Sequence, residues 1–392
     1  MLKGKTVAPL TLGCKVNQYE TDGMIELLKE AGMTAVSFEE KADVYLINTC
    51  SVTNMADKKS RQMIHRAKKL NPDAVVIAAG CYVQAAKDKL MEDDRISIII
   101  GNNKKKDIVQ ILEDYLEIGV TDEGMLDIAA EKEYEPLTIN STLEHTRAYV
   151  KIQDGCNQFC SYCIIPYVRG RIRSRELASI TEEVERLAQT GVKEIVLTGI
   201  HISSYGKDKE NEVGLADVID AISKIESIER IRLGSLEPGI ITDTFIDRIV
   251  DNKKVCPHFH LSLQSGCNTV LKRMNRKYTC EEYFEKCEML RKAFDRPALT
   301  TDVIVGFPGE TDEEFQETVD YLTKLNLYEM HIFKFSPRQG TVAAGMRDQI
   351  GPEIKNQRSD VLLALSEKNK HAYEASFRGE TLEVLIEEKV RR

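Results

Sequence analysis

The stretch GCNQFCSYCIIPY, residues 155–167, brings together three cysteines: Cys156, Cys160 and Cys163. It directly follows the apolar run Ala148–Ile152, which we predict to be a β-strand. The three thiols therefore fall at the carboxyl end of a strand, where parallel barrels build their active sites. A structural zinc site is closed by four ligands, and a fully ligated four-iron cluster takes four cysteines. Three cysteines at this place favour an iron–sulfur cluster with one open iron over a zinc site.

Outward from this loop, apolar runs and helical patterns alternate to give six strand–helix units. Such alternation predicts parallel strands joined by right-handed crossovers. A closed barrel needs eight units, so we expect a partial (β/α)6 barrel. The predicted strands are Ala148–Ile152, Glu194–Thr198, Arg230–Leu236, His258–Leu263, Leu299–Val305 and Glu329–Phe335. The predicted helices are Ile180–Thr190, Leu215–Ile225, Asp243–Val250, Glu281–Ala293, Asp312–Leu325 and, after the last strand, Glu367–Ala375.

The chain before this region has a similar alternation of its own, and the fold class is α/β throughout. Strands separated by helices, with continuous apolar runs, predict an N-terminal doubly wound parallel sheet domain. Its predicted strands are Val7–Leu12, Val44–Asn48, Val75–Ala79 and Ile96–Ile100. Its predicted helices are Glu20–Ala31, Asn54–Leu70, Gln84–Glu92 and Lys106–Glu117.

These patterns divide the chain into parts. We expect an N-terminal domain over residues 1–118, a linker over 119–141 and the partial barrel over 142–372. The linker has poor periodicity and several acids. From residue 379 the sequence alternates like a strand, so we expect a third, β-rich module to begin within 375–392.

Three more cysteines occupy equivalent places in the N-terminal domain. Cys14, Cys50 and Cys81 each follow the carboxyl end of a predicted strand by no more than two residues. In an open parallel sheet those ends line the crevice where ligands bind. Each alone reads equally well as a small buried hydrophobe, but together they favour a second three-cysteine cluster. The remaining cysteines are expected to be packing residues: Cys256, Cys267, Cys280 and Cys287.

Composition narrows the class of protein. The sequence has no apolar run near the roughly 20 residues that span a bilayer and no secretory leader, so we expect a cytoplasmic protein without a membrane partner. Ten cysteines in 392 residues are too sparse for a disulfide scaffold. The net charge of -9 does not indicate nucleic-acid binding, but two local runs are basic. Lys58–Lys69 and Tyr167–Arg175 contain Lys and Arg but no acid, which is also typical of a solvated face.

The Cys-x3-Cys-x2-Cys motif on a six-unit partial barrel resembles the radical S-adenosylmethionine (SAM) superfamily. The resemblance implies a [4Fe-4S] cluster whose open iron binds SAM, with reductive cleavage to a 5′-deoxyadenosyl radical. It also implies cofactor contacts after successive strands. We expect these contacts at Thr198, Gly199, Glu237, Gln264 and Gly306, although glycines mark any turn.

Two three-cysteine sites in this domain order resemble one family of that superfamily, the methylthiotransferases. The likeness runs over essentially the whole chain, in the segments TLGCKVNQYET, INTCSVTNMADKKSRQ, AAGCYVQ, GCNQFCSYCIIPYVRGRIRSR, HLSLQSG, TDVIVGFPGET and FKFSPRQGT. It implies two [4Fe-4S] clusters, an external electron donor and a C-terminal RNA-binding TRAM β-barrel, of which 375–392 would be the start. The sulfur donor is left open.

Family members act on threonylcarbamoyladenosine in tRNA, isopentenyladenosine in tRNA or an aspartate of a ribosomal protein. The segment GCKVNQYE, residues 13–20, resembles the branch that modifies C2 of N6-threonylcarbamoyladenosine at position 37. We expect Lys15 to meet the threonine carboxylate, and an arginine run to meet tRNA phosphates: Arg169, Arg171, Arg173 and Arg175. The other substrates stay open, as do an electron-transfer protein and a tRNA-binding scaffold with structural zinc.

Overall fold

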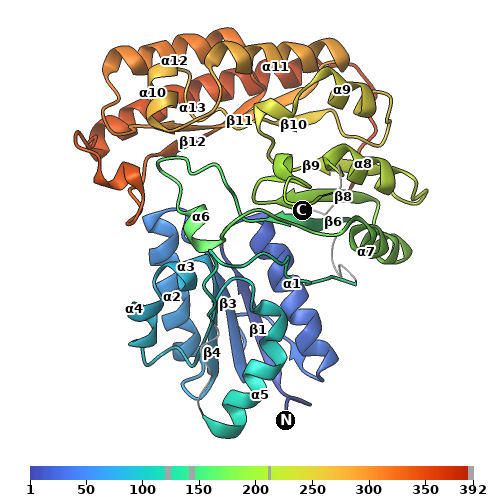
Figure 1. The fold of residues 1–392 in the computed structure, drawn as a ribbon, viewed down its shortest axis with the longest axis vertical. Coiled ribbons are helices and arrows are strands. Elements are labelled where there is room, and N and C mark those ends of the chain that lie inside the picture. Colours follow the sequence, from blue (N-terminus) through green and yellow to red (C-terminus); the bar gives the residue numbers. More distant parts are fainter. Residues whose placement is uncertain (120–124, 141–145, 211–212, 387–392) are drawn as a thin grey trace.

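A computed structural model describes residues 1–119, 125–140, 146–210 and 213–386 of the chain. Its N-terminal part is a five-stranded parallel sheet in the order β2-β1-β3-β4-β5, with helices on both faces (Figure 1). The strands are β1 Thr6–Thr11, β2 Thr34–Ala35, β3 Val44–Thr49, β4 Val75–Gly80 and β5 Ile98–Ile100. The helices are α1 Lys15–Glu30, α2 Asn54–Leu70, α3 Cys81–Ala85, α4 Lys87–Met91, η1 Lys105–Asp107 and α5 Ile108–Ile118.

The central strand β3 shows why this sheet is covered on both sides. All six of its residues are buried. Val44 and Leu46 belong to one apolar core, whereas Tyr45 and Ile47 belong to a second core on the opposite face. Because successive side chains of a strand point to opposite faces, a continuous apolar run requires two covering layers. The predicted doubly wound parallel sheet is confirmed.

The second part is a curled sheet with helices on its outside (Figure 1). It consists of the groups β7-β6-β8-β9 and β10-β11-β12, joined by parallel bridges such as Leu236 to Leu261. Apart from the short antiparallel β7, the strands are parallel, which confirms the partial (β/α)6 barrel. The strands are β6 Arg147–Asp154, β7 Arg173–Ser174, β8 Glu194–Gly199, β9 Arg230–Leu233, β10 His258–His260, β11 Ala298–Val305 and β12 Glu329–Lys334. The helices are α6 Ile165–Val168, α7 Leu177–Gln189, η2 Ile202–Ser204, α8 Leu215–Ser223, η3 Pro238–Ile240, α9 Asp243–Ile249, α10 Asn268–Arg273, α11 Cys280–Ala293, α12 Asp312–Leu325, η4 Val342–Gly345 and α13 Pro352–Ala375.

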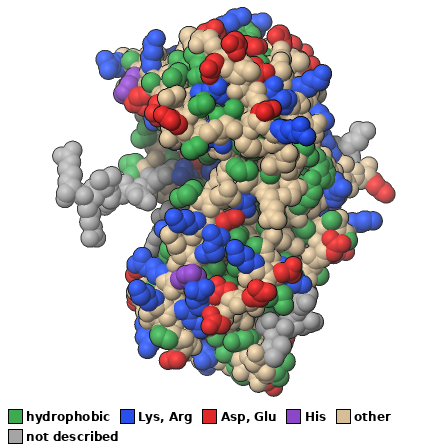
Figure 2. Space-filling view, turned by 90° about the vertical axis from the view of Figure 1, so that its left-hand side faces the viewer, with side chains coloured by type: hydrophobic (Ala, Val, Ile, Leu, Met, Phe, Trp, Pro, Cys, Tyr) green, Lys and Arg blue, Asp and Glu red, His purple; other side chains and the backbone are tan. Residues whose placement is uncertain are grey.

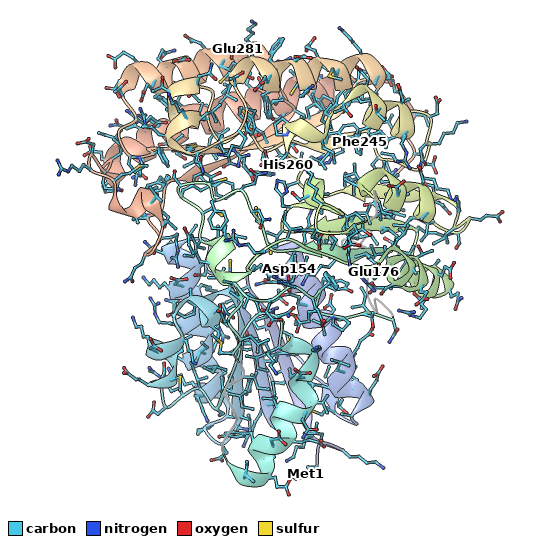
Figure 3. The ribbon with its side chains drawn as sticks, viewed as in Figure 1. Met1, Asp154, Glu176, Phe245, His260 and Glu281 are labelled. Atoms are coloured by element: carbon cyan, nitrogen blue, oxygen red, sulfur yellow. The ribbon has the colours of Figure 1, made fainter. Side chains whose placement is uncertain are left out.

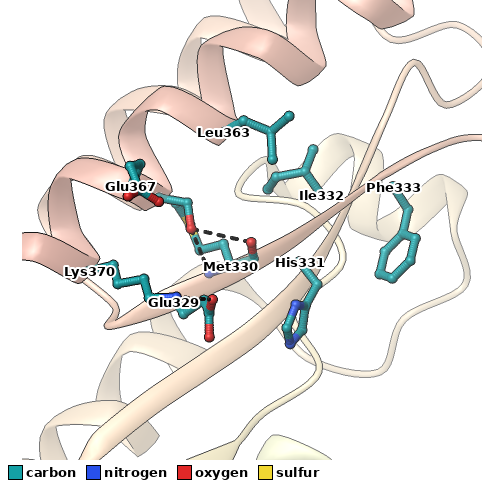
Figure 4. Close-up of a pocket in the computed structure, with 9 residues that line it drawn as sticks. Glu329, Met330, His331, Ile332, Phe333, Leu363, Glu367 and Lys370 are labelled. Carbon is teal, nitrogen blue, oxygen red and sulfur yellow. Dashed lines mark hydrogen bonds and ion pairs between the residues drawn. The ribbon is translucent and has the colours of Figure 1, made fainter. Parts of the chain in front are cut away.

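The two faces of the curled sheet differ in chemistry. Alternate residues of β6 and β8, including Val150 and Leu197, lie in one apolar core with the outer helices α7 and α8. The residues between them face the concave side. The polar and charged ones there include Arg147, Tyr149, Glu194, Thr198, Arg230 and Arg232. The alternation continues on β12, where Ile332 faces Leu363 of α13 and His331 lies on the opposite side (Figure 4).

Three of the predicted helices differ clearly from the observed ones. The predicted helix Gln84–Glu92 is two short helices, because Ala86 has a non-helical backbone. The helix predicted from Glu20 begins at Lys15 and so starts directly after Cys14. The predicted helix Glu367–Ala375 is only the last part of α13, which begins at Pro352.

The expected strand after residue 378 does not form within the described residues. Residues 379–386 have no regular secondary structure and are mostly exposed, and 387–392 lie outside the described part. A strand needs a partner to satisfy its backbone groups, and no described strand pairs with this segment. The start of a TRAM module therefore stays a prediction.

The expected linker is packed rather than loose over its described residues, 125–140. Leu137 and Ile139 are buried in the barrel core, and the Tyr19 hydroxyl of α1 donates a hydrogen bond of 2.6 Å to the Leu137 carbonyl. The segment thus ties the two α/β parts together. Among the described residues, the helices all fall short of the apolar length that crossing a membrane would take.

Candidate active site

The loop after β6 holds the first set of cysteines in a compact turn. Gly155 opens it with a φ of 70°, and a Cβ there would lie 1.8 Å from the Arg171 carbonyl oxygen, so only glycine fits. Burial, together with the nearby Cys160 because neighbouring thiolates repel, raises the pKa of Cys156 to about 11 and that of Cys163 to about 12. Three free thiols that share one electrostatic environment can supply three ligands of an iron–sulfur cluster.

A charged pair lies beside this set. Nη1 of Arg276 lies 3.1 Å from the Cys160 sulfur, and its Nη2 lies 2.5 Å from Glu237. Burial opposes ionisation of Glu237, but His201, whose Nε2 lies 3.7 Å from the carboxylate, and the charge of Arg276 hold its pKa below the usual range. Glu237 is therefore an anion close to the first set, as expected for a residue that follows the third barrel strand.

The second set lies at the carboxyl edge of the N-terminal sheet. Cys14, Cys50 and Cys81 follow β1, β3 and β4, which are neighbouring strands of that sheet. A Cβ at Gly13 would lie 2.9 Å from the Cys50 sulfur, so the loop that carries Cys14 is packed directly against Cys50. Burial, together with the nearby Cys81 and Cys14, raises the pKa of Cys50 to about 11. The structure thus brings these three thiols to one place.

Both sets fit the group that the sequence predicts. All six cysteines are free, and the three thiols of each set lie in one region of the fold. Each triad offers three thiolates rather than four, which leaves one coordination position of a four-iron cluster open. The remaining cysteines are buried at 0–4% exposure, in agreement with their prediction as packing residues: Cys256, Cys267, Cys280 and Cys287.

The predicted cofactor contacts lie at the carboxyl ends of the barrel strands or in the loops that follow them. Thr198 is buried, and a Cβ at Gly199 would lie 2.9 Å from the Gln153 carbonyl oxygen. Gln264 has a φ of 76° and bridges to Val303 of β11. The Gly306 amide donates a 2.7 Å hydrogen bond to Glu310.

A cavity of about 620 Å³ adjoins these loops. It reaches from Gln158 of the first cysteine loop past His201 and Glu237 to Tyr278. Its volume falls in the range of small-molecule sites, about 300–1,000 Å³. The cavity therefore provides room for a small molecule beside the first cysteine set.

Three of the four arginines expected to contact tRNA are not on the surface. Arg169, Arg173 and Arg175 are 0%, 1% and 3% exposed, so their assignment to a phosphate-binding surface is wrong. Arg169 and Arg173 form ion pairs with Asp154, which Figure 3 shows where the N-terminal sheet meets the barrel. Arg175 pairs with Glu183 of α7. Burial among carboxylates, rather than exposure to solvent, explains this run of charge.

The other two expected tRNA contacts are exposed. Arg171 is at the surface, with its guanidinium carbon 4.5 Å from the centre of the Phe159 ring in the cysteine loop. Lys15 is also exposed, at the first position of α1 and next to Cys14. Both remain available to a large ligand that approaches the cysteine sets.

Several residues near the cysteines were missed from the sequence. Arg276 carries no motif that would have marked it. Asn17 and Glu20 stand in the segment that contains Cys14, and their proximity to that cysteine was a usable signal. Asn102 and Arg338 reach the site from loops distant in the sequence, and only the fold reveals them.

Comparison with known proteins agrees with this geometry. The radical SAM superfamily model matches residues 150–322, and the model of uncharacterized protein family UPF0004 matches residues 6–101. A radical SAM methyltransferase of known structure, TsrM from Kitasatospora setae, shares the fold with a TM-score of 0.63 at 15% identity, over 87% of this chain and 77% of that chain. Fold and cysteine pattern thus define a radical SAM protein with an additional cysteine-bearing α/β domain.

Closer relatives refine that class. The chain is 44% identical to the threonylcarbamoyladenosine tRNA methylthiotransferase MtaB of Bacillus subtilis, over 98% of this chain and 85% of the relative. It is 38% identical to the tRNA-2-methylthio-N(6)-dimethylallyladenosine synthase of Thermoanaerobacter pseudethanolicus, over 96% of this chain and 81% of that relative. The chain belongs to the radical SAM tRNA methylthiotransferases. The cofactors of this family are SAM and two iron–sulfur clusters.

Proposed function

We propose that this protein transfers a methylthio group to C2 of N6-threonylcarbamoyladenosine at position 37, beside the anticodon of tRNA. The relative with 44% identity bears that substrate in its name, whereas the one with 38% identity bears dimethylallyladenosine. Identity alone does not separate two substrates of one family. The choice between them rests on the chemistry of the concave face next to Cys14.

The observation that carries the proposal is a group of cations on this face. The Lys15 ammonium and the Arg147 guanidinium carbon each lie 6.0 Å from the centre of the Tyr149 ring. Arg232 shares the row of Tyr149, because both residues pair with Val196 across neighbouring parallel strands. Lys15 and Arg147 therefore flank one aromatic ring, and Arg232 lies two strands away on the same face of the sheet.

The electrostatics of this group favour an anionic ligand. Partial burial, Arg147 and Arg232 lower the pKa of Lys15, because its own charge is repelled there. The nearby carboxylate of Glu194 is already engaged, at 2.7 Å from Arg230 and 3.0 Å from Arg232. A bound anion would relieve the repulsion between the cations.

This preference distinguishes the candidate substrates. A threonylcarbamoyl group carries a free carboxylate, whereas a dimethylallyl group is a hydrocarbon without charge. A carboxylate gains charge-assisted hydrogen bonds from Lys and Arg, whereas a hydrocarbon can accept none from them. The cation group therefore supports threonylcarbamoyladenosine.

Recognition of the tRNA body is supported by exposed charge. Helix α2 presents Lys58, Lys59, Arg66 and Lys69 to solvent, and Figure 2 shows Lys and Arg side chains gathered on the lower lobe, where α2 lies. With Arg171 near the first cysteine set, these cations suit the phosphates of an anticodon loop. We infer that this surface binds tRNA in the cytoplasm.

We assign Cys156, Cys160 and Cys163, in a core domain over 142–372, to the cluster that binds SAM. We assign Cys14, Cys50 and Cys81, in a domain over 1–118, to the auxiliary cluster. SAM and the clusters supply the radical and the methylthio group when an external donor provides electrons. Thr198, Gly199, Glu237, Gln264 and Gly306 bind SAM in this proposal, and Lys15 orients the modified base.

Nucleoside mass spectrometry of tRNA from a deletion strain tests the substrate. We expect loss of 2-methylthio-N6-threonylcarbamoyladenosine, with the unmethylthiolated form accumulating, and restoration by the wild-type gene but not by a Cys160→Ala variant. Loss of the methylthio group from the dimethylallyl nucleoside instead, with the threonylcarbamoyl form intact, would reject the proposal.

A further inference from the structure

Arg169 links the two cysteine sets through a single buried side chain. It follows α6, the short helix directly after the Cys156–Cys163 loop, and its side chain is 0% exposed. Its Nε lies 3.2 Å from the sulfur of Cys81, a cysteine of the other set. A residue positioned by one cluster loop thus donates a hydrogen bond to a cysteine sulfur of the other.

The rest of the guanidinium is held on all sides. Nη1 lies 2.7 Å from Glu20 and 3.1 Å from Asp154, and Nη2 lies 2.7 Å from the Asn17 side-chain oxygen and 3.0 Å from Glu20. Asn17 and Glu20 lie on α1, which follows Cys14, whereas Asp154 ends β6. The planar guanidinium therefore has one orientation, with Nε directed at the sulfur.

The same two backbone segments pack directly on each other. Cys81 shares a small apolar cluster with Ile164 and Val168, which flank and end α6. Asn102 donates a 2.6 Å hydrogen bond to the Val168 carbonyl, and its side chain also lies 3.8 Å from the Cys81 sulfur. The position of Cys81 is thus tied to the loop that carries the first cysteine set.

The cations around Arg169 outnumber the carboxylates that pair with them. Its ion pairs join four cations to two carboxylates, Glu20 and Asp154; the cations are Lys105, Lys151, Arg169 and Arg173. Glu135 lies nearby, but burial raises its pKa and so disfavours its charged form. A thiolate at Cys81 supplies negative charge at the atom that Nε faces.

We propose that Arg169 is a positioning residue that fixes Cys81 at the auxiliary cluster and raises the reduction potential of that cluster. Hydrogen bonds to cluster sulfurs are among the factors that set such potentials. A cation and an N–H donor favour the reduced, more negative form of a cluster. This inference rests on the assignment of Cys14, Cys50 and Cys81 made in the proposed function.

The test uses the full chain with Cys156, Cys160 and Cys163 changed to alanine, so that only the auxiliary cluster is loaded. We expect Arg169→Lys, which keeps the charge but not the directed Nε donor, to shift the midpoint potential to a more negative value in an EPR-monitored titration. The matched control is Arg175→Lys, because Arg175 is equally buried but bonds to Tyr19, Ser179 and Glu183 rather than to a cysteine. An unchanged potential in Arg169→Lys at full iron content, or an equal shift in Arg175→Lys, overturns the inference.

A second measurement needs no variant of Arg169. In the same protein labelled with ¹⁵N-arginine, electron–nuclear double resonance of the reduced cluster should detect a ¹⁵N coupling from an arginine nitrogen next to a cluster sulfur. Absence of that coupling contradicts the inference even if Arg169→Lys does not fold. Failure of the starting protein to hold any cluster would instead reject the cysteine assignment itself.

Discussion

At the scale of residues, the cysteines and the arginines of this chain differ in how far the sequence predicts them. Cys14, Cys50 and Cys81 were predictable because the ends of parallel strands meet at one edge of a sheet, so a local pattern implies a shared location. Arg169 was not, because its burial depends on Glu20, 149 positions away in the sequence. A run of charge normally indicates a solvated face, and nothing local marks the partners that enclose it.

Substitutions in the two cysteine sets should affect SAM cleavage and methylthio transfer differently. Cys160→Ala should reduce SAM cleavage to the background level and abolish the methylthio product, because the cluster that binds SAM loses a ligand. Cys50→Ala should retain most of the cleavage but form no methylthio product. Quantification of 5′-deoxyadenosine and modified nucleoside in one reaction checks both, and methylthio product from Cys50→Ala would refute the auxiliary role.

Lys15 should govern recognition of the carboxylate. We expect Lys15→Met to raise KM for tRNA containing threonylcarbamoyladenosine by about tenfold, in line with removal of one charge-assisted hydrogen bond of about 1.5–3 kcal/mol. SAM cleavage without tRNA should be unchanged, since the residue contacts the substrate only. Lys29→Met, at the exposed far end of the same helix, is the control. Equal KM values for Lys15→Met and wild type would remove Lys15 from the substrate site.

At the scale of elements, periodicity predicted the order and type of most long segments, although it gave only the last part of α13. Helix α2 matches its predicted bounds, Asn54–Leu70, and Thr311 caps α12 through a box with Glu314, as an N-cap signal predicts. The short elements were not predictable. The two residues of β2 and the antiparallel β7 exist only because a neighbouring strand offers free backbone groups, which no local pattern reveals.

Helix α2 should contribute to tRNA affinity through charge. Replacing Lys58 and Lys59 by alanine should weaken tRNA binding and reduce the slope of log affinity against log salt by about one for each lysine–phosphate ion pair that the substitutions remove. Lys292→Ala with Lys368→Ala, on exposed positions of α11 and α13, removes the same charge elsewhere. Filter binding at several salt concentrations measures both pairs, and an equal weakening in the two pairs would point to net charge alone.

At the scale of the whole molecule, the N-terminal sheet and the barrel are joined by buried charge. Glu20 of the first part lies 2.7 Å from Lys151 and Arg169 of the second and is itself 0% exposed. Tyr19 and Glu183 form a second connection, at 3.0 Å. These contacts orient the two cysteine sets toward each other, which the sequence could not show because each partner looks locally like a surface residue.

Breaking this junction should destabilise the protein. Glu20→Gln leaves Lys105, Lys151 and Arg169 without their shared carboxylate, for an expected decrease of about 3–5 kcal/mol in unfolding free energy. Glu39→Gln, which removes the exposed partner of Arg66, should cost less than about 1 kcal/mol. Urea unfolding under anaerobic conditions compares the two variants. Similar decreases in both would mean that the buried network adds no more than a surface pair.

The junction also predicts a pH dependence. Burial alone would raise the pKa of Glu20, but Arg169, Lys105 and Lys151 hold it well below the usual range. Its folded pKa is therefore lower than the unfolded value of about 4.3, so its contribution to stability is complete above that pH and declines as the pH falls. Wild type should lose unfolding free energy below about pH 4 more steeply than Glu20→Gln. Parallel pH profiles would contradict this role of Glu20.

A competition between two tRNAs in one reaction, with purified holoenzyme, SAM and a reductant, tests whether the protein methylthiolates threonylcarbamoyladenosine. One tRNA carries N6-threonylcarbamoyladenosine at position 37 and the other carries dimethylallyladenosine there. Liquid chromatography with mass spectrometry then quantifies both methylthio nucleosides. We predict product from the threonylcarbamoyl tRNA in at least tenfold excess, since its carboxylate can gain a charge-assisted hydrogen bond beside Cys14, and a tenfold preference corresponds to about 1.4 kcal/mol. Equal turnover of both tRNAs, or a preference for the dimethylallyl form, would contradict this substrate assignment.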